Sequence, residues 1–96
     1  IQISDRVTQS DLKWTGNKID LVELIYGLFA SKSINNGDVE IKELTEKLAT
    51  FFNIDLKNQY RTFNELKRRK NKTSYIDDMS SNLKELIDFS DFYKES

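Results

Sequence analysis

The segment at residues 17–31 decides how the rest of this chain can fold. Its apolar residues are spaced so that they cover most of the circumference of a helix: Ile19, Leu21, Val22, Leu24, Ile25, Tyr26, Leu28 and Phe29. A helix that is apolar on nearly every side must be surrounded by other elements. Thr15 or Asn17 can cap it, and the acidic Asp20 and Glu23 lie near its positive end. We therefore expect a central core helix.

Two further segments have the spacing of half-buried helices. Residues 40–52 place Ile41, Leu44, Leu48 and Phe51 at positions i, i+3, i+7 and i+10. Residues 75–89 repeat the pattern with Ile76, Met79, Leu83 and Leu86, and Ser74 with Asp77 resembles a capping box. We expect this last helix to pack back on the others.

The segments between the helices leave room for a minimal sheet at most. Asn35, Asn36 and Gly37 tolerate positive φ and predict a tight turn, and Ile34 or Val39 could belong to a very short strand. Residues 12–14 favour a short extended segment, and residues 1–11 an arm or linker. Residues 71–74 are too few for a two-stranded wing. We expect residues 12–96 to form a mainly α helix-turn-helix or reduced winged-helix-like domain of about four helices.

The charge of the chain is segregated. Residues 57–72 contain seven basic residues and one acidic residue, a net of +6, in a chain whose formal net charge is −1. Asp55 is a suitable N-cap for a basic helix over residues 56–70, and residues 53–55 would join it to the preceding helix in a three-residue turn. Two helices joined in this way are a helix-turn-helix candidate.

The basic helix has two distinct sides. Leu56, Tyr60 and Phe63 share one side and should pack on the core, whereas the outward stripe comprises Lys57, Arg61, Asn64 and Arg68. This is the profile of a helix that reads the major groove of duplex DNA. Arg61 could donate two hydrogen bonds to a guanine edge, and Asn64 could pair with adenine. Thr62 or Lys57 could contact a base or a phosphate. Cations at the far end would hold phosphates: Lys67, Arg68, Arg69, Lys70 and Lys72. The alternative is that these cations only complement the helix dipole and keep the helix soluble.

Composition excludes several other classes of function. The chain has no Cys and no His, so disulfides, thiolate zinc sites and imidazole bases are ruled out, which fits a cytoplasmic protein. No apolar stretch approaches the roughly 20 residues that span a membrane. We identify no candidate catalytic residues and no candidate site for a cofactor, a metal or a small-molecule substrate. Trp14 and Tyr60 could stack on bases, but a core role is favoured. The start at Ile1 indicates a piece of a longer protein.

Several stretches resemble the RteC family of Bacteroides-type mobile elements: WTG at 14–16, LVELIYGLFAS at 21–31, SINNG at 33–37, IKEL at 41–44 and YRTFNELKRRKNKTSYID at 60–77. The resemblance implies a transcriptional regulator whose carboxy-terminal domain, of winged-helix type, binds promoter DNA and activates the excision genes of a conjugative transposon. Lys72 and Ser74 stand where the family tends to have arginine and lysine, which weakens one phosphate clamp. The alternative is a protein-interaction module that docks a partner through its acidic face or aromatic tail.

Overall fold

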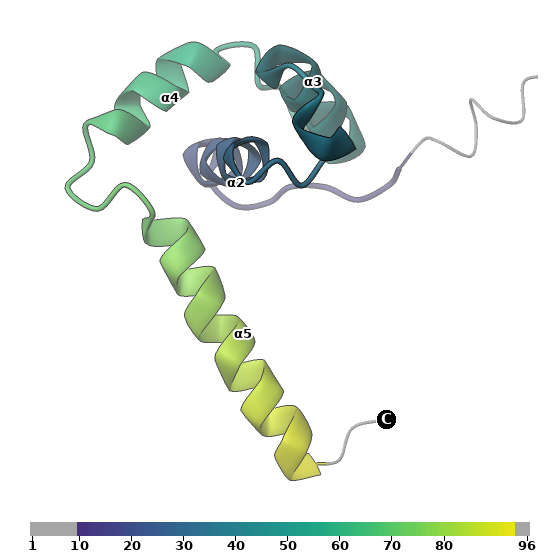
Figure 1. Cartoon of the computed structure of the whole chain (residues 1–96), viewed down its shortest axis with the longest axis vertical. Coiled ribbons are helices and arrows are strands. Elements are labelled where there is room, and N and C mark those ends of the chain that lie inside the picture. The colour runs from purple at the N-terminus through teal and green to yellow at the C-terminus, as the bar shows by residue number, and fades with distance from the viewer. Residues whose placement is uncertain (1–9, 94–96) are drawn as a thin grey trace, which may run out of the picture.

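The computed structural model describes residues 10–93, which are mainly helical as expected (Figure 1). The elements are α2 (Lys18–Ala30), the 3-10 turn η1 (Asn35–Gly37), α3 (Ile41–Phe51), α4 (Gln59–Lys67) and α5 (Ser74–Tyr93). Residues 10–93 contain no strand, so neither the short strands considered beside Ile34 and Val39 nor a wing is formed there. The predicted arm at residues 1–11 lies almost entirely outside this range.

Helix α2 is the centre of the structure, as its apolar circumference predicts. Leu21, Val22 and Ile25 are completely buried, and α3, α4 and α5 each pack against α2. Leu44 of α3 completes the core with Leu21 and Ile25, and partly buried side chains from several other segments close it. The chain is thus organised around one helix, with the other three arranged about it (Figure 1).

Trp14 attaches the segment before α2 to the rest of the fold. Its backbone N–H donates to the carbonyl of Phe52 at 3.0 Å, and its indole N–H donates to the carbonyl of Asn17 at 2.9 Å. The ring makes edge contacts with Phe52 and Tyr75, at centroid distances of 5.7 and 5.9 Å. The predicted core role of Trp14 is therefore confirmed.

The turn between α2 and α3 also follows the prediction. Asn35 and Asn36 have φ values of 53° and 57°, and Gly37 has φ of 85°. Asparagine and glycine are the residues that adopt this left-handed conformation at the lowest cost. A Cβ atom at Gly37 would also approach the side chain of Lys32 to 3.0 Å. Both the left-handed backbone conformation and the close Lys32 side chain therefore favour glycine there.

The prediction that α5 packs back on the other helices is wrong beyond its first turn. Ser74, Tyr75 and Ile76 are half-buried, but the side chains at positions 77–89 are exposed. Figure 1 shows α5 leading away from the other helices as one unbroken element. Because no glycine or proline interrupts it, the helix continues in the direction that its first turn sets.

The basic helix is shorter than predicted. It begins at Gln59, not at residue 56, and residues 52–58 separate it from α3 in place of a three-residue turn. Asp55 is not its N-cap, because the Asp55 carboxylate accepts the backbone N–H of Lys57 at 2.9 Å and closes a turn before the helix. Tyr60 is 59% exposed, so the prediction that it packs in the core is also wrong. Leu66 and Phe63 form the inner side of α4 instead.

Candidate nucleic-acid interface

Helix α4 is held on α2 by an aromatic pair. The rings of Phe63 and Tyr26 are stacked with centroids 4.0 Å apart and an interplanar angle of 8°. The opposite side of α4 consequently faces solvent, and Arg61, Asn64 and Arg68, at positions i, i+3 and i+7, are all exposed. Two of the four residues predicted for the outward stripe, Arg61 and Asn64, therefore lie on one side of this helix, and a third, Arg68, is its exposed C-cap residue.

The fourth stripe residue, Lys57, lies before α4, and its side chain is 84% exposed. It lines a hollow of about 260 Å³ together with Arg61 and with Lys18 from the start of α2. We call the surface formed by Lys18, Lys57 and Arg61 the cationic hollow. Asn58 and Thr62 add polar groups to its wall, and the Asp55 carboxylate lies 3.9 Å from the Lys57 ammonium.

Backbone groups add to the positive potential of the cationic hollow. The side chain of Asn58, at the N-cap position of α4, makes no capping hydrogen bond. The first N–H groups of a helix lack partners within the helix and carry the positive end of its dipole. Three cationic side chains, one carboxylate (Asp55) and the N-cap residue of α4 therefore line the same hollow, a net positive set that suits an anionic group such as a phosphate.

Lys18 was not predicted as a site residue. It lies 39 positions before Lys57 in the chain, on a helix whose pattern is that of the core. Only the packing of α4 on α2 brings it beside the basic segment. Helical periodicity within one segment contains no such signal, so the sequence pattern could not have identified it.

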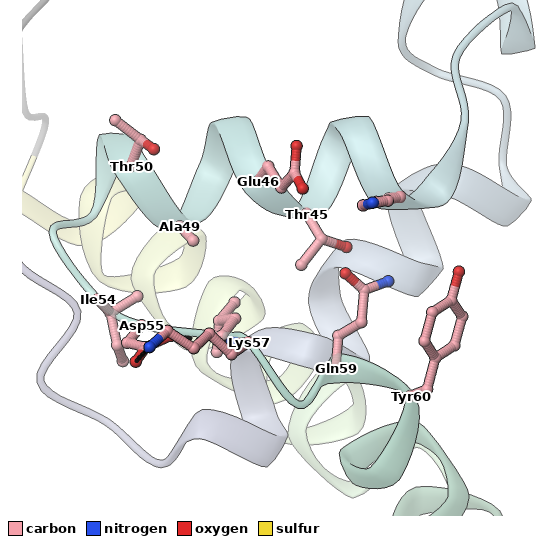
Figure 2. A pocket seen from close by; sticks show the side chains of 11 residues that line it. Thr45, Glu46, Ala49, Thr50, Ile54, Asp55, Lys57, Gln59 and Tyr60 are labelled. Carbon is pink, nitrogen blue, oxygen red and sulfur yellow. Dashed lines mark hydrogen bonds and ion pairs between the residues drawn. The ribbon is translucent and has the colours of Figure 1, made fainter.

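A second, larger cleft of about 490 Å³ lies between α3 and α4 (Figure 2). Figure 2 shows Thr45 of α3 and Gln59 of α4 projecting toward each other from the two helices. The Thr45 hydroxyl oxygen and the Gln59 amide nitrogen are buried and make no hydrogen bond. Lys57 and Tyr60 also line this cleft, so the α3–α4 cleft and the cationic hollow adjoin along Lys57.

Arg69 lies inside the fold and not on the predicted phosphate-binding surface. Its guanidinium is 3.0 Å from a Glu23 carboxylate oxygen and 3.3 Å from a carboxylate oxygen of Asp20, and it donates to the Ser74 hydroxyl at 2.8 Å. Glu23 is only 2% exposed. Asp20 lies in the first turn of α2 as predicted, and together with Glu23 it neutralises a cation that follows α4.

The remaining cations at the far end of α4 are exposed: Lys67, Arg68, Lys70 and Lys72. The Lys67 ammonium lies 5.5 Å from the centroid of the Phe63 ring, which is cation–π distance. The Lys72 ammonium donates to the carbonyl of Arg69 at 3.1 Å, at the turn into α5. These four side chains form a second basic area, separated from the cationic hollow by the length of α4.

The described part of the chain offers little to other kinds of site. Among residues 10–93, no three acidic side chains come together in a way that could hold a metal ion. None of the helices described there combines the length and the apolar character needed to cross a membrane.

Comparison with protein-family models identifies one family. The model described as RteC protein matches residues 2–91, which is nearly the whole chain. Comparison with curated proteins and with solved structures gives no match.

Proposed function

The chain belongs to the RteC family, and on that basis we propose that it is a DNA-binding domain of a transcriptional regulator of conjugative-transposon excision. The observation that carries the proposal is the cationic hollow, in which Lys18 of α2, Lys57 of the segment before α4 and Arg61 of α4 line one hollow at the surface of a chain of net negative charge. Lysine and arginine that neutralise phosphates supply most of the affinity of proteins for duplex DNA.

In this proposal the cationic hollow seats a backbone phosphate. The Lys18 and Lys57 ammonium groups hold the anion, Arg61 lies at the edge of the hollow, and the N-cap residue of α4 lines it, so that the free N–H groups of the helix start are near. Asn58 and Thr62 line the same hollow and can donate hydrogen bonds. Contacts of this kind set the position and orientation of a protein on DNA without reading its sequence.

The outward side of α4 supplies the sequence-reading groups. Arg61 and Arg68 have the forked guanidinium that pairs with a guanine edge, and Asn64 has the amide that pairs with adenine. An α-helix is about 10–12 Å across with its side chains, so α4 fits the major groove, which is about 12 Å wide. In this arrangement α3 and α4 correspond to the two helices of a helix-turn-helix with a lengthened connection.

The basic area at the far end of α4 grips the DNA backbone a second time. Lys67, Arg68, Lys70 and Lys72 are exposed and can reach phosphates. Arg69 is left out of the contact set because its charge is already neutralised by Glu23 and Asp20. The proposal requires no cofactor, metal or catalytic step, and it places the protein in the cytoplasm, where its DNA would be.

Fluorescence anisotropy with a labelled 20-base-pair duplex of random sequence at low salt tests the proposal. We expect micromolar binding, which Arg61→Ala weakens about tenfold because it removes a cation shared by the hollow and the outward side of α4. The control is Lys47→Ala, which removes an exposed cation of α3 that lines neither the cationic hollow nor the α3–α4 cleft. Absence of binding, or equal effects of the two substitutions, would refute the proposal.

A further inference from the structure

The α3–α4 cleft contains two buried polar atoms that have no hydrogen-bond partner. Thr45 of α3 is 2% exposed and Gln59 of α4 is 5% exposed. The Thr45 hydroxyl oxygen and the Gln59 amide nitrogen are both unpaired, and the two side chains project toward each other from the two helices (Figure 2). A buried polar atom without a partner is costly, and native structures contain few of them. Two such atoms in the walls of one cleft indicate that a ligand provides the missing hydrogen bonds.

The cleft has the size and the walls of a small-molecule site. Its volume of about 490 Å³ is within the range of clefts that bind small ligands. Ala49, Ile54 and Leu56 contribute apolar surface, and Tyr60 contributes an exposed aromatic ring. Apolar and aromatic walls with a few convergent polar groups favour a planar organic molecule that hydrogen-bonds along one edge.

Charge divides this region into a neutral part and a positive part. The α3–α4 cleft is lined by two lysines and two acids, which leave it without net charge: Lys42, Lys57, Glu46 and Asp55. The cationic hollow has three cations against the single Asp55 carboxylate, a net of +2. Lys57 lines both. A ligand that matches the two parts has an uncharged ring at one end and an anionic group at the other.

An adenine nucleotide has this combination of groups. The amide of glutamine can form two hydrogen bonds with adenine, donating to a ring nitrogen and accepting from the amino group. The last torsion of a glutamine side chain is broad, so a rotation can turn either amide atom of Gln59 toward the base. The Thr45 hydroxyl, which can both donate and accept, suits a further ring nitrogen. The Tyr60 ring suits stacking on the base.

We propose that the α3–α4 cleft binds an adenine nucleotide, with the base between Thr45 and Gln59 and the phosphate held by Lys57. The Lys57 side chain is 84% exposed and is therefore free to turn toward the phosphate. Nucleotide binding requires no DNA, so it can be measured whether or not the chain binds DNA. If both proposals hold, the bound nucleotide occupies a cation of the cationic hollow and lowers the affinity for duplex DNA.

Isothermal titration calorimetry of the chain with adenosine monophosphate tests the proposal. We expect saturable binding with a Kd of about 100 µM. Guanosine monophosphate should bind about tenfold more weakly, because its ring nitrogen and its carbonyl oxygen both accept hydrogen bonds and cannot pair with both amide atoms. Adenosine, which lacks the phosphate, should also bind more weakly, and Lys57→Ala should remove that difference. Absence of binding at about 1 mM adenosine monophosphate, or equal affinities for the two nucleotides, would overturn the proposal.

Two substitutions separate ligand binding from folding. Thr45→Val and Gln59→Leu nearly keep the side-chain volume but remove the unpaired polar atoms, so each should leave the Tm unchanged or raise it. Each should nevertheless raise the Kd for adenosine monophosphate about tenfold, because the ligand loses a hydrogen bond. Tyr26→Phe is the matched control, since the Tyr26 hydroxyl is also buried without a partner but does not line the cleft. Nucleotide affinity that is unchanged in both Thr45→Val and Gln59→Leu would contradict the assignment.

Discussion

The guanidinium of Arg69 lies 3.0 Å from the carboxylate of Glu23, which is 2% exposed. The same carboxylate accepts the backbone N–H groups of Tyr75 and Ile76 at the start of α5. One buried acid of α2 therefore connects the segment after α4 to the first turn of α5. The free N–H groups of a helix start and a guanidinium are both suitable partners for a carboxylate that has left water.

Removing Arg69 should destabilise the fold considerably. Arg69→Ala leaves the Glu23 carboxylate buried without its cation, and we expect the free energy of unfolding to fall by about 3 kcal/mol. Urea denaturation followed by circular dichroism measures the change. Arg68→Ala is the matched control, because its exposed neighbouring side chain should contribute less than about 0.5 kcal/mol. Equal stabilities of the two variants would show that the buried ion pair contributes little.

The Tyr26 ring and the Tyr26 hydroxyl should have opposite effects on stability. The ring stacks on Phe63, but the hydroxyl oxygen is buried without a hydrogen-bond partner. Tyr26→Phe should therefore leave stability unchanged or raise it by up to about 1 kcal/mol, since it removes an unsatisfied polar group. Phe63→Ala should lower stability by about 2 kcal/mol through lost packing. Thermal unfolding distinguishes these outcomes, and a clear loss in Tyr26→Phe would show that the hydroxyl has a partner in solution.

The turn before α3 should depend on its glycine. Gly37→Ala forces a side chain into a left-handed backbone conformation and against Lys32, and we expect a loss of about 1 kcal/mol in the free energy of unfolding. At Gly16 an added Cβ would meet the Trp14 ring at an ordinary 3.4 Å, and its φ is not left-handed. Gly16→Ala is therefore the control, expected within about 0.5 kcal/mol of the wild type. Similar losses in both would argue against a specific requirement at Gly37.

The features predicted correctly from the sequence are those that local patterns determine. The apolar circumference of α2, the Asn36–Gly37 turn and the core role of Trp14 each depend on side chains a few residues apart. The start of α4 was placed three residues too early because Asp55 can close a turn as readily as it can cap a helix. The predicted core side of this helix includes Tyr60 because it is centred on Leu56. With Leu56 outside α4, the inner side is centred on Phe63 and Leu66, and Tyr60 lies at its edge.

The features that were missed depend on contacts between distant segments. In the sequence Arg69 cannot be distinguished from the other cations of the basic segment. Its partner Glu23 lies 46 positions earlier in the chain, and only the fold brings the two together. Lys18 joins the cationic hollow only because α4 packs on α2. The apolar residues of α5 have the same periodicity whether or not the helix packs on its own molecule, so the pattern alone could not predict that the side chains at positions 77–89 are exposed.

The most direct test of the DNA-binding proposal is the salt dependence of duplex affinity for Lys18→Ala. If about five phosphates are neutralised, the logarithm of the wild-type association constant should fall with the logarithm of salt concentration at a slope of roughly −4 to −5. Lys18→Ala should reduce the magnitude of that slope by about one, whereas Lys47→Ala should leave it unchanged. A wild-type affinity that is insensitive to salt, or a slope for Lys18→Ala equal to that of the wild type, would contradict the role of the cationic hollow.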